Sequence, residues 1–320
     1  MNMPDYKLDG RLEQSTSSPL IIGFLGLVVA FVLFQGISLV VTLGILLSSD
    51  ISLSDMMGDL DQVLSDNAAS ILVANTIGQF FGLLIPAILI TRLHSSNWKS
   101  YLRLRGVDGR VLALSIVALF ALIPLVQWFG VMSDSLPWPD SIRSFEKSQM
   151  DLIEGILTKD FPLLFTIAML ALTPAICEEI LFRGYFQRQA ERSQGIVWGI
   201  ILSGVVFGLY HMRLTQAIPL SMLGVFMAYL TWRTNSILPA MLVHLANNSF
   251  AAVLGKFASK DGATIDLETF EMPLIVVIPA TIVLIGVLVV LHRLSIEAEH
   301  SDVQNLGSAV VLKPEDSGIV

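Results

Sequence analysis

The chain has 320 residues, of which 54% are hydrophobic and only 14% are charged, and its mean hydropathy is +0.72. This balance excludes an ordinary soluble domain and is typical of an integral membrane protein. The net charge of −8 argues against nucleic acid as a partner, because nucleic-acid-binding surfaces are basic. The single cysteine, Cys177, cannot form an intrachain disulfide.

The polar first 18 residues are expected to form a cytoplasmic tail, residues 1–18. The apolar run that follows is too long for the core of a signal peptide, so it predicts a retained membrane span and no cleaved leader. Residues 19–294 are expected to form one membrane domain with its motif-bearing core at 170–255. Residues 295–320 are expected to form a flexible acidic C-terminal tail.

Apolar segments along the chain predict an all-α fold, a polytopic membrane bundle of about eight transmembrane helices, since a crossing needs about 20 apolar residues. The segments are 20–47, 69–91, 111–132, 162–187, 196–211, 215–232, 237–255 and 273–293. The fifth and sixth are short and close in sequence, and they predict a tight helical hairpin buried by the others. Residues 139–158 mix apolar and charged side chains, which fits either a short interfacial helix or a solvated loop.

The distribution of lysine and arginine predicts the topology. With the N-terminus inside, thirteen of the 19 basic residues fall on inner segments and six fall in outer loops. The first outer loop, residues 49–67, has five aspartates and no lysine or arginine. The positive-inside rule therefore favours both termini in the cytoplasm, for a protein of the cell membrane.

Two adjacent acids, Glu178 and Glu179, lie in the otherwise apolar run 170–186. A charge at the centre of a spanning helix costs roughly 2.5–3.5 kcal/mol, so these acids need partners, a wet cavity or a chemical purpose. Glu179 and Arg183 are four residues apart, share a helix face and can pair. Glu178 points about 100° away around the axis and is free for a different partner. The alternative is that both acids are solvated at the cytoplasmic helix end.

Two later segments carry histidine. Phe207 and His211 share a face at the end of an uncharged stretch, and His244 and Asn248 share a face inside the seventh segment. Such residues can be ordinary interfacial or helix-bridging groups. However, a carboxylate, two imidazoles and a carboxamide on three apolar helices are also what water activation and oxyanion stabilisation require.

In that chemistry, Glu178 would act as a general base towards water, and His211 would orient the water or share its proton. His244 and Asn248 could donate hydrogen bonds to the oxyanion that develops on an attacked peptide carbonyl. Glu178, His211 and His244 with a water also match an open catalytic zinc site. The cofactor is therefore either none or Zn(II), with those three residues as the metal ligands in the second case.

The three motifs, in this order, resemble the CPBP family of intramembrane proteases. This family includes CAAX prenyl endopeptidases and bacterial relatives linked to bacteriocin processing or self-immunity. The resemblance covers about 75 residues, 174–248, and it is carried by Glu178, Glu179, Arg183, Phe207, His211, His244 and Asn248.

The resemblance implies an intramembrane endopeptidase in which Glu178 is the catalytic base, completed by His211, His244 and Asn248. Glu179 would support this site, with Arg183 and Phe207 as structural support. It also implies a cavity open to the cytoplasm. The partners would be the lipid bilayer and a peptide or protein substrate at the membrane, although a prenylated substrate does not follow from the motifs. Metallo- and glutamate-based mechanisms both occur as proposals for the family.

Two other functions use the same residues. A transporter could employ them as a proton relay, and a catalytically silent binding or immunity protein could use the cavity to hold a peptide. The hydrolase also poses a geometric problem. In straight helices the imidazoles of His211 and His244 would lie roughly 10 Å apart in depth. We therefore predict that the fourth helix continues past Arg183 to about Ala190, which places Glu178 deeper in the membrane.

Overall fold

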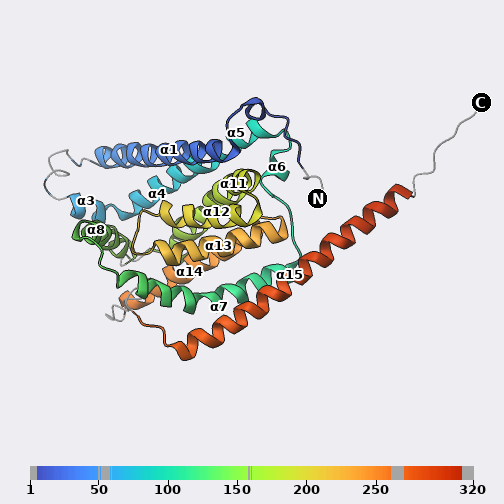
Figure 1. Cartoon of the computed structure of the whole chain (residues 1–320). Coiled ribbons are helices and arrows are strands. Elements are labelled where there is room, and N and C mark those ends of the chain that lie inside the picture. The colour runs from blue at the N-terminus through green and yellow to red at the C-terminus, as the bar shows by residue number, and fades with distance from the viewer. Residues whose placement is uncertain are drawn as a thin grey trace, which may run out of the picture.

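A computed structural model describes residues 6–49, 51, 58, 60–157, 159, 161–260 and 270–311. Helices make up nearly all of these residues, and no strand occurs among them. The helices lie side by side and run roughly across the view in Figure 1, and α15 extends beyond the bundle at one end. The predicted all-α fold, a polytopic helical membrane bundle, is confirmed.

Six helical runs of the described chain are long and apolar enough to cross a membrane. They are α1 (Pro19–Ser48), the run Ala68–His94, α7 (Gly109–Asp134), the run Leu163–Gln194, α14 (Leu238–Lys260) and α15 (Leu274–Val311). The predicted fifth and sixth segments form the shorter helices α12 (Ile196–Tyr210) and α13 (Ala217–Thr234). All eight predicted segments are thus helical.

Two of the long runs contain π-helical turns. The first consists of α4 (Ala68–Gly78), η2 (Gln79–Leu84) and α5 (Ile85–His94). The second consists of α9 (Leu163–Ile167), η3 (Ala168–Leu172), α10 (Thr173–Glu179), η4 (Ile180–Phe186) and α11 (Gln187–Gln194). Single π-turns inside α-helices are frequent at functional sites. The second run continues to Gln194, so the predicted extension to Ala190 is confirmed and exceeded.

The remaining described elements are short or lie outside the spans: η1 (Arg11–Gln14), α3 (Leu60–Asp66), α6 (Trp98–Tyr101) and α8 (Asp140–Leu157). Helix α8 confirms the helical alternative for residues 139–158. In the predicted C-terminal tail, the helix continues to residue 311, and residues 312–320 lie outside the described part. Most of the predicted acidic loop 49–67 also lies outside it.

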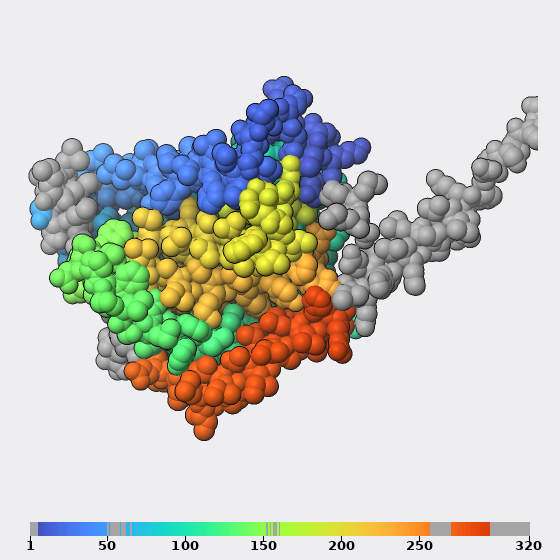
Figure 2. Space-filling view, in the orientation of Figure 1, coloured from blue at the N-terminus to red at the C-terminus, as the bar shows by residue number. Residues whose placement is uncertain are grey.

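Helix α12 keeps an exposed face, contrary to the prediction that the others bury the hairpin, whereas nearly all of α13 is buried or half-buried. Figure 2 shows residues 196–234 in yellow and orange on the molecular surface, between α1 in blue and α15 in red. Val197 and Trp198 are 68% and 59% exposed. The sequence of α12 is apolar all round, and an apolar side chain next to lipid leaves no unsatisfied polar group, so a free face carries no penalty.

The two helices of this hairpin approach each other closely through glycine. A Cβ atom added at Gly224 would lie 2.5 Å from the carbonyl oxygen of Gly204, and one at Gly204 would lie 2.4 Å from the backbone nitrogen of Val225. Small residues let neighbouring helix backbones approach in membranes, where contact is driven by packing. The close contact brings the backbone of α13 within reach of side chains from the run Leu163–Gln194.

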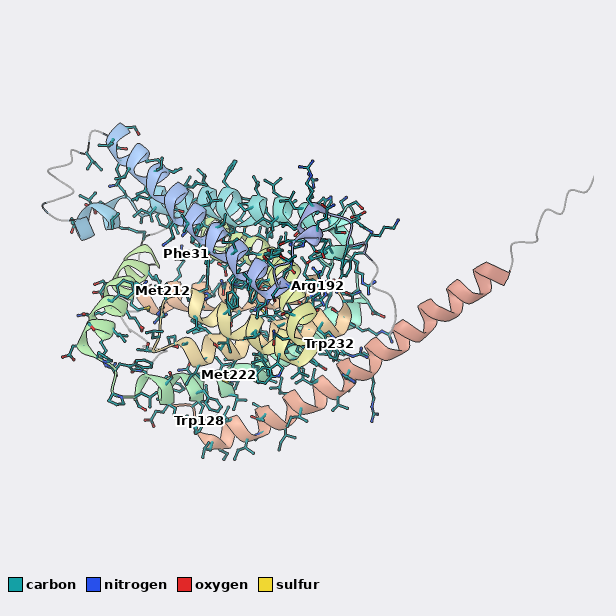
Figure 3. The ribbon with its side chains drawn as sticks, turned by 45° about the horizontal axis from the view of Figure 1, so that its top comes forward. Phe31, Trp128, Arg192, Met212, Met222 and Trp232 are labelled. Atoms are coloured by element: carbon teal, nitrogen blue, oxygen red, sulfur yellow. The ribbon has the colours of Figure 1, made fainter. Side chains whose placement is uncertain are left out.

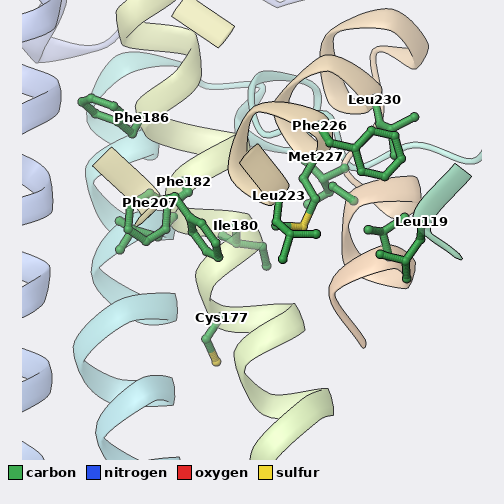
Figure 4. Packing of buried hydrophobic residues seen from close by; sticks show 14 of the residues in the cluster. Leu119, Cys177, Ile180, Phe182, Phe186, Phe207, Leu223, Phe226, Met227 and Leu230 are labelled. Atoms are coloured by element: carbon green, nitrogen blue, oxygen red, sulfur yellow. The ribbon is translucent and has the colours of Figure 1, made fainter. Parts of the chain in front are cut away.

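The main hydrophobic core lies between that run and the hairpin. Figure 4 shows Phe182 beside Phe207, with Leu223 and Met227 on α13 facing Ile180. The two phenylalanine rings meet edge to face with their centroids 5.3 Å apart. The polar motif residues lie next to this core.

The N-terminal segment is docked onto one end of the bundle. The backbone nitrogen of Gly10 donates to the carbonyl of His94 at 3.0 Å, and the Glu13 carboxylate contacts His94 Nδ1 and Arg192 Nη2, both at 2.6 Å. Figure 3 labels Arg192 at this end of the molecule. Partial burial would raise the pKa of Glu13, but the hydrogen bonds from Arg192 and His94 outweigh it and hold that pKa below its ordinary value of 4.5.

The glycine contact predicts the effect of adding one methyl group. We expect Gly204→Ala to destabilise the protein by about 1–3 kcal/mol, because the new Cβ meets backbone that cannot move aside. Gly286→Ala is the matched control, since the space around Gly286 in α15 is open within 4 Å. Thermal unfolding in detergent measures both. Equal midpoints for the two variants would contradict close packing at Gly204.

The docking of the N-terminal segment should depend on pH. The folded-state pKa of Glu13 is depressed, so its contribution is complete above about pH 4.5 and is lost as the pH falls through the folded-state value. We expect the protection of residues 6–14 from hydrogen exchange, relative to the intrinsic rate at each pH, to fall on acidification in the wild type. Glu13→Gln should show low protection at every pH. High protection that does not change with pH in that variant would show that the carboxylate does not hold the segment.

Candidate active site

The innermost part of the site is a buried ionic triad. Oε1 of Glu179 accepts from Nη1 of Arg183 at 2.7 Å and from Nδ1 of His244 at 2.8 Å. The side chains of Glu179 and Arg183 have no exposed surface, and His244 is 4% exposed. The predicted pair at spacing i, i+4 is therefore formed, and it is extended by a histidine 65 residues further along the chain.

Arg183 connects this triad to the hairpin of α12 and α13. Its Nη2 donates to the carbonyl of Gly224 at 3.1 Å, and its guanidinium lies 4.2 Å from the ring centroid of Phe207. A buried guanidinium needs such partners, because burying an unpaired charge costs several kcal/mol. The close approach of α12 and α13 at Gly224 is what supplies the carbonyl.

Phe207 brings the two histidines together. Its ring meets the imidazole of His211 at 4.8 Å between centroids and that of His244 at 5.7 Å, both edge to face. The predicted difference in depth between the histidines is thus closed. The guanidinium of Arg183 also lies against this ring, so Phe207 contacts Arg183 and both histidines of the motifs.

A small cavity of about 30 Å³ opens between the histidines. This volume is sufficient for a water molecule. His211, His244, Asn247 and Asn248 supply its polar lining, and Leu220, Leu223, Met227 and Val243 are among its apolar walls. Three of the predicted site residues, His211, His244 and Asn248, therefore converge on one cavity.

Hydrogen bonds to the backbone orient two of these side chains. Nδ1 of His211 lies 2.9 Å from the carbonyl of Phe207, and Nδ2 of Asn248 donates to the carbonyl of Leu170 at 3.2 Å. Leu170 is in the π-turn η3, and the residue four positions on, whose N–H would bond its carbonyl in a regular α-helix, is Pro174, which has no N–H, so this carbonyl is available. Because a carbonyl can only accept, His211 carries the Nδ1 proton, and its neutral form presents an Nε2 lone pair.

Glu178 stands apart from this cluster. We expected an acid to line the cavity together with the imidazoles and the carboxamide, but neither Glu178 nor Glu179 belongs to the described residues that line it. The side chain is half-buried, and its Oε2 is buried without a hydrogen-bond partner among the described residues. A buried carboxylate oxygen without a protein partner is costly unless water or a ligand satisfies it. Oε2 of Glu179 is also buried without a partner among the described residues, but its Oε1 is held by Arg183 and His244, whereas Glu178 is in no such ion pair. Glu178 is therefore the more available of the two acids.

The residues do not form the zinc site that was one of the two alternatives. In the described part of the chain, no three histidine, cysteine or acidic side chains gather closely enough to hold a metal ion. The proposed ligands Glu178, His211 and His244 are divided between the cavity and its surroundings. We assign no step of peptide hydrolysis to a metal.

Sequence reasoning missed three parts of this site. The Glu179–His244 contact depends on the rotation of α14 relative to α10, and the carbonyls of Leu170 and Gly224 are backbone groups, of which only that of Leu170 has a sequence signal, Pro174 four residues on. Asn247, next to Asn248 in the sequence, also lines the cavity and donates to Oδ1 of Asn248 at 3.3 Å. The π-turns η2, η3 and η4 were not predicted from the sequence.

Comparison with known proteins identifies the region that holds these residues. The sequence 160–250 matches the family model for Rce1-like type II CAAX prenyl endopeptidases. Residues 160–250 form an Rce1-like domain. No curated protein and no solved structure matches the chain.

The Rce1-like domain contains every motif residue that carried the resemblance to CPBP intramembrane proteases. The predicted resemblance is therefore confirmed. Members of this family are proteases, and with six apolar membrane-length helices in its described part the chain is an integral membrane protein. Residues outside the domain contribute α1, η2 and α7, which pack against it.

The triad of the Rce1-like domain predicts a stability defect. We expect Arg183→Met to destabilise the protein by about 3–5 kcal/mol, because Glu179 would keep a buried charge with one partner fewer. Adding Glu179→Gln in that background should recover part of the loss. The measurement is a double-mutant cycle of thermal unfolding in detergent. Two losses that simply add would contradict a coupled pair.

Proposed function

We propose that the protein is an intramembrane endopeptidase that hydrolyses a peptide bond of a membrane-associated substrate with water activated by Glu178. The observation that carries this proposal is the convergence of His211, His244 and Asn248 on one cavity inside the Rce1-like domain. Two separate helical elements supply these groups, since His211 ends α12 whereas His244 and Asn248 both lie on α14. CAAX-type processing is the substrate class that the family suggests.

The first step is removal of a proton from water by Glu178. Its unpartnered buried oxygen is a free acceptor, and a general base typically contributes a factor of about 10²–10⁴ in rate. His211 assists by accepting a hydrogen bond from the same water at Nε2, since its Nδ1 proton is held by Phe207. The resulting hydroxide attacks the peptide carbonyl, and the proton then passes to the leaving amine.

The second requirement is stabilisation of the oxyanion. Asn248 uses one N–H for Leu170 and has a second to donate. His244 donates from Nε2 when both its nitrogens carry protons, and the Glu179 carboxylate at Nδ1 stabilises that imidazolium. With Arg183 included, the triad then has one net positive charge next to the developing negative charge.

The expected location follows from the charge pattern. We propose that the protein lies in the cell membrane with both termini in the cytoplasm, as the positive-inside distribution favours. The substrate is a peptide or protein at the bilayer, and it is lipidated if the processing is of the CAAX type. The cavity fits a water but not a peptide, so the surrounding side chains must move apart when substrate binds.

Replacing the proposed base tests the function. We expect Glu178→Gln to reduce cleavage by a factor of 10² or more while the fold is retained, because the amide keeps the shape but cannot accept the proton. The measurement is quantitative proteomics of membrane peptides in cells that carry the wild type or the variant. Glu271→Gln, which alters an exposed acid, is the matched control.

Other outcomes would overturn the proposal in distinguishable ways. Unchanged peptides in Glu178→Gln cells, with unchanged binding of a partner peptide, would indicate a silent binding protein. Loss of proton flux in reconstituted vesicles without any change in cleavage products would indicate a relay. Full cleavage by Glu178→Gln together with none by Glu179→Gln would move the base to the neighbouring residue.

A further inference from the structure

Helix α8, outside the Rce1-like domain, reaches over the turn that joins α12 to α13. Figure 1 shows α8 in dark green at the end of the bundle where this turn lies, and Figure 3 labels Met212 within the turn, next to α8. From the middle of α8, Glu146 extends into the protein and is only 5% exposed. A buried acid on a mainly polar helix needs a specific reason.

The carboxylate of Glu146 binds the turn through three hydrogen bonds. Oε1 accepts from the backbone nitrogens of Leu214 at 2.6 Å and Thr215 at 3.2 Å, and Oε2 accepts from the Thr215 hydroxyl at 2.5 Å. Hydrogen bonds to an ionised acceptor are shorter and roughly twice as strong as neutral ones. The contact joins residues that are 68 and 69 positions apart in sequence.

The bound turn begins at His211. Helix α12 ends at Tyr210, and Met212 takes a left-handed backbone conformation with φ of 56°. Helix α13 then starts after Gln216, whose side chain provides no capping hydrogen bond. The backbone N–H groups just before α13 would therefore lack an acceptor from their own segment, and Glu146 supplies it. Its negative charge also lies at the N-terminal end of the α13 dipole, where it is favourable.

We infer that Glu146 is a positioning residue for His211. This inference rests on the proposed function, in which His211 orients the attacking water. His244 is fixed by the buried triad, whereas His211 is half-exposed at a helix end, with Nδ1 on the Phe207 carbonyl as its own anchor. Glu146 locks the next residues of the chain and so limits the displacement of the imidazole. Misplacement of a reacting group by about 1 Å can cost 10² in rate.

Two substitutions at Glu146 distinguish a role in positioning His211 from a general structural role of the Glu146 side chain. We expect Glu146→Ala to lower kcat ten- to a hundredfold with KM changed less than threefold. Glu146→Gln, which still offers an oxygen to the two backbone N–H groups, should lower kcat two- to fivefold. Asp151→Ala and Asp151→Asn are matched controls, because Asp151 is an exposed acid on the same helix.

A second measurement does not depend on activity. We expect the imidazole NMR signal of His211, identified by its absence in His211→Gln, to shift and broaden in Glu146→Ala in detergent micelles. The Asp151 variants should leave this signal unchanged. An unaltered His211 signal in folded Glu146→Ala protein would overturn the inference. So would a loss of activity that Glu146→Gln does not rescue.

The two readouts also separate this inference from the proposed function. If no variant and no wild-type sample cleaves membrane peptides, the endopeptidase proposal fails, while the NMR comparison still decides whether Glu146 holds His211. If Glu146→Ala does not fold, Glu146→Gln and Thr215→Val remain. Thr215→Val removes one hydrogen bond, and it should reproduce the smaller fall in kcat together with a shifted His211 signal. A wild-type kcat in both Glu146→Gln and Thr215→Val would overturn the inference.

Discussion

The buried guanidinium of Arg183 is the constraint on which the site depends. It has no contact with solvent, so the fold must provide its counter-charge and its acceptors from inside. Glu179 supplies the charge, Gly224 the carbonyl and Phe207 the ring face. These three come from different elements, α10, α13 and α12, and one side chain thus fixes their relative positions.

Close approach and irregular helix geometry make those partners available. The contact at Gly204 and Gly224 brings the α13 backbone to Arg183, because a side chain on either residue would hold the helices apart. Pro174, which follows the π-turn η3, leaves the carbonyl of Leu170 available for Asn248. Membrane helices can depart from regular bonding in this way where the surrounding protein satisfies the freed groups. The irregular positions therefore coincide with the polar site.

The sequence was sufficient for the helices and for the pairs within each helix. Membrane thickness sets the length of an apolar run, and the spacing i, i+4 puts Glu179 with Arg183 and Phe207 with His211 on shared faces. Contacts between helices were less accessible, because they depend on rotation and depth. The convergence of His211 and His244 was predicted. The hydrogen bond of His244 to Glu179 was not, because it depends on how α14 is rotated relative to α10. The carbonyl of Gly224 has no residue-type signal, whereas Pro174, four residues after Leu170, marks a carbonyl without its α-helical donor.

The two histidines of the cavity are held in different ways, and this difference bears on how substrate enters. His244 belongs to the buried triad, so moving it would separate charges with no water to replace their partners. His211 is half-exposed at the start of a turn whose firmest external contact is Glu146 on α8. Displacing that turn costs hydrogen bonds near the surface, where water can take them over. We therefore expect the cavity to open on the His211 side, with α8 moving alongside the turn. In the proposed topology this side is opposite to the cytoplasm, towards which the resemblance implied that the cavity opens.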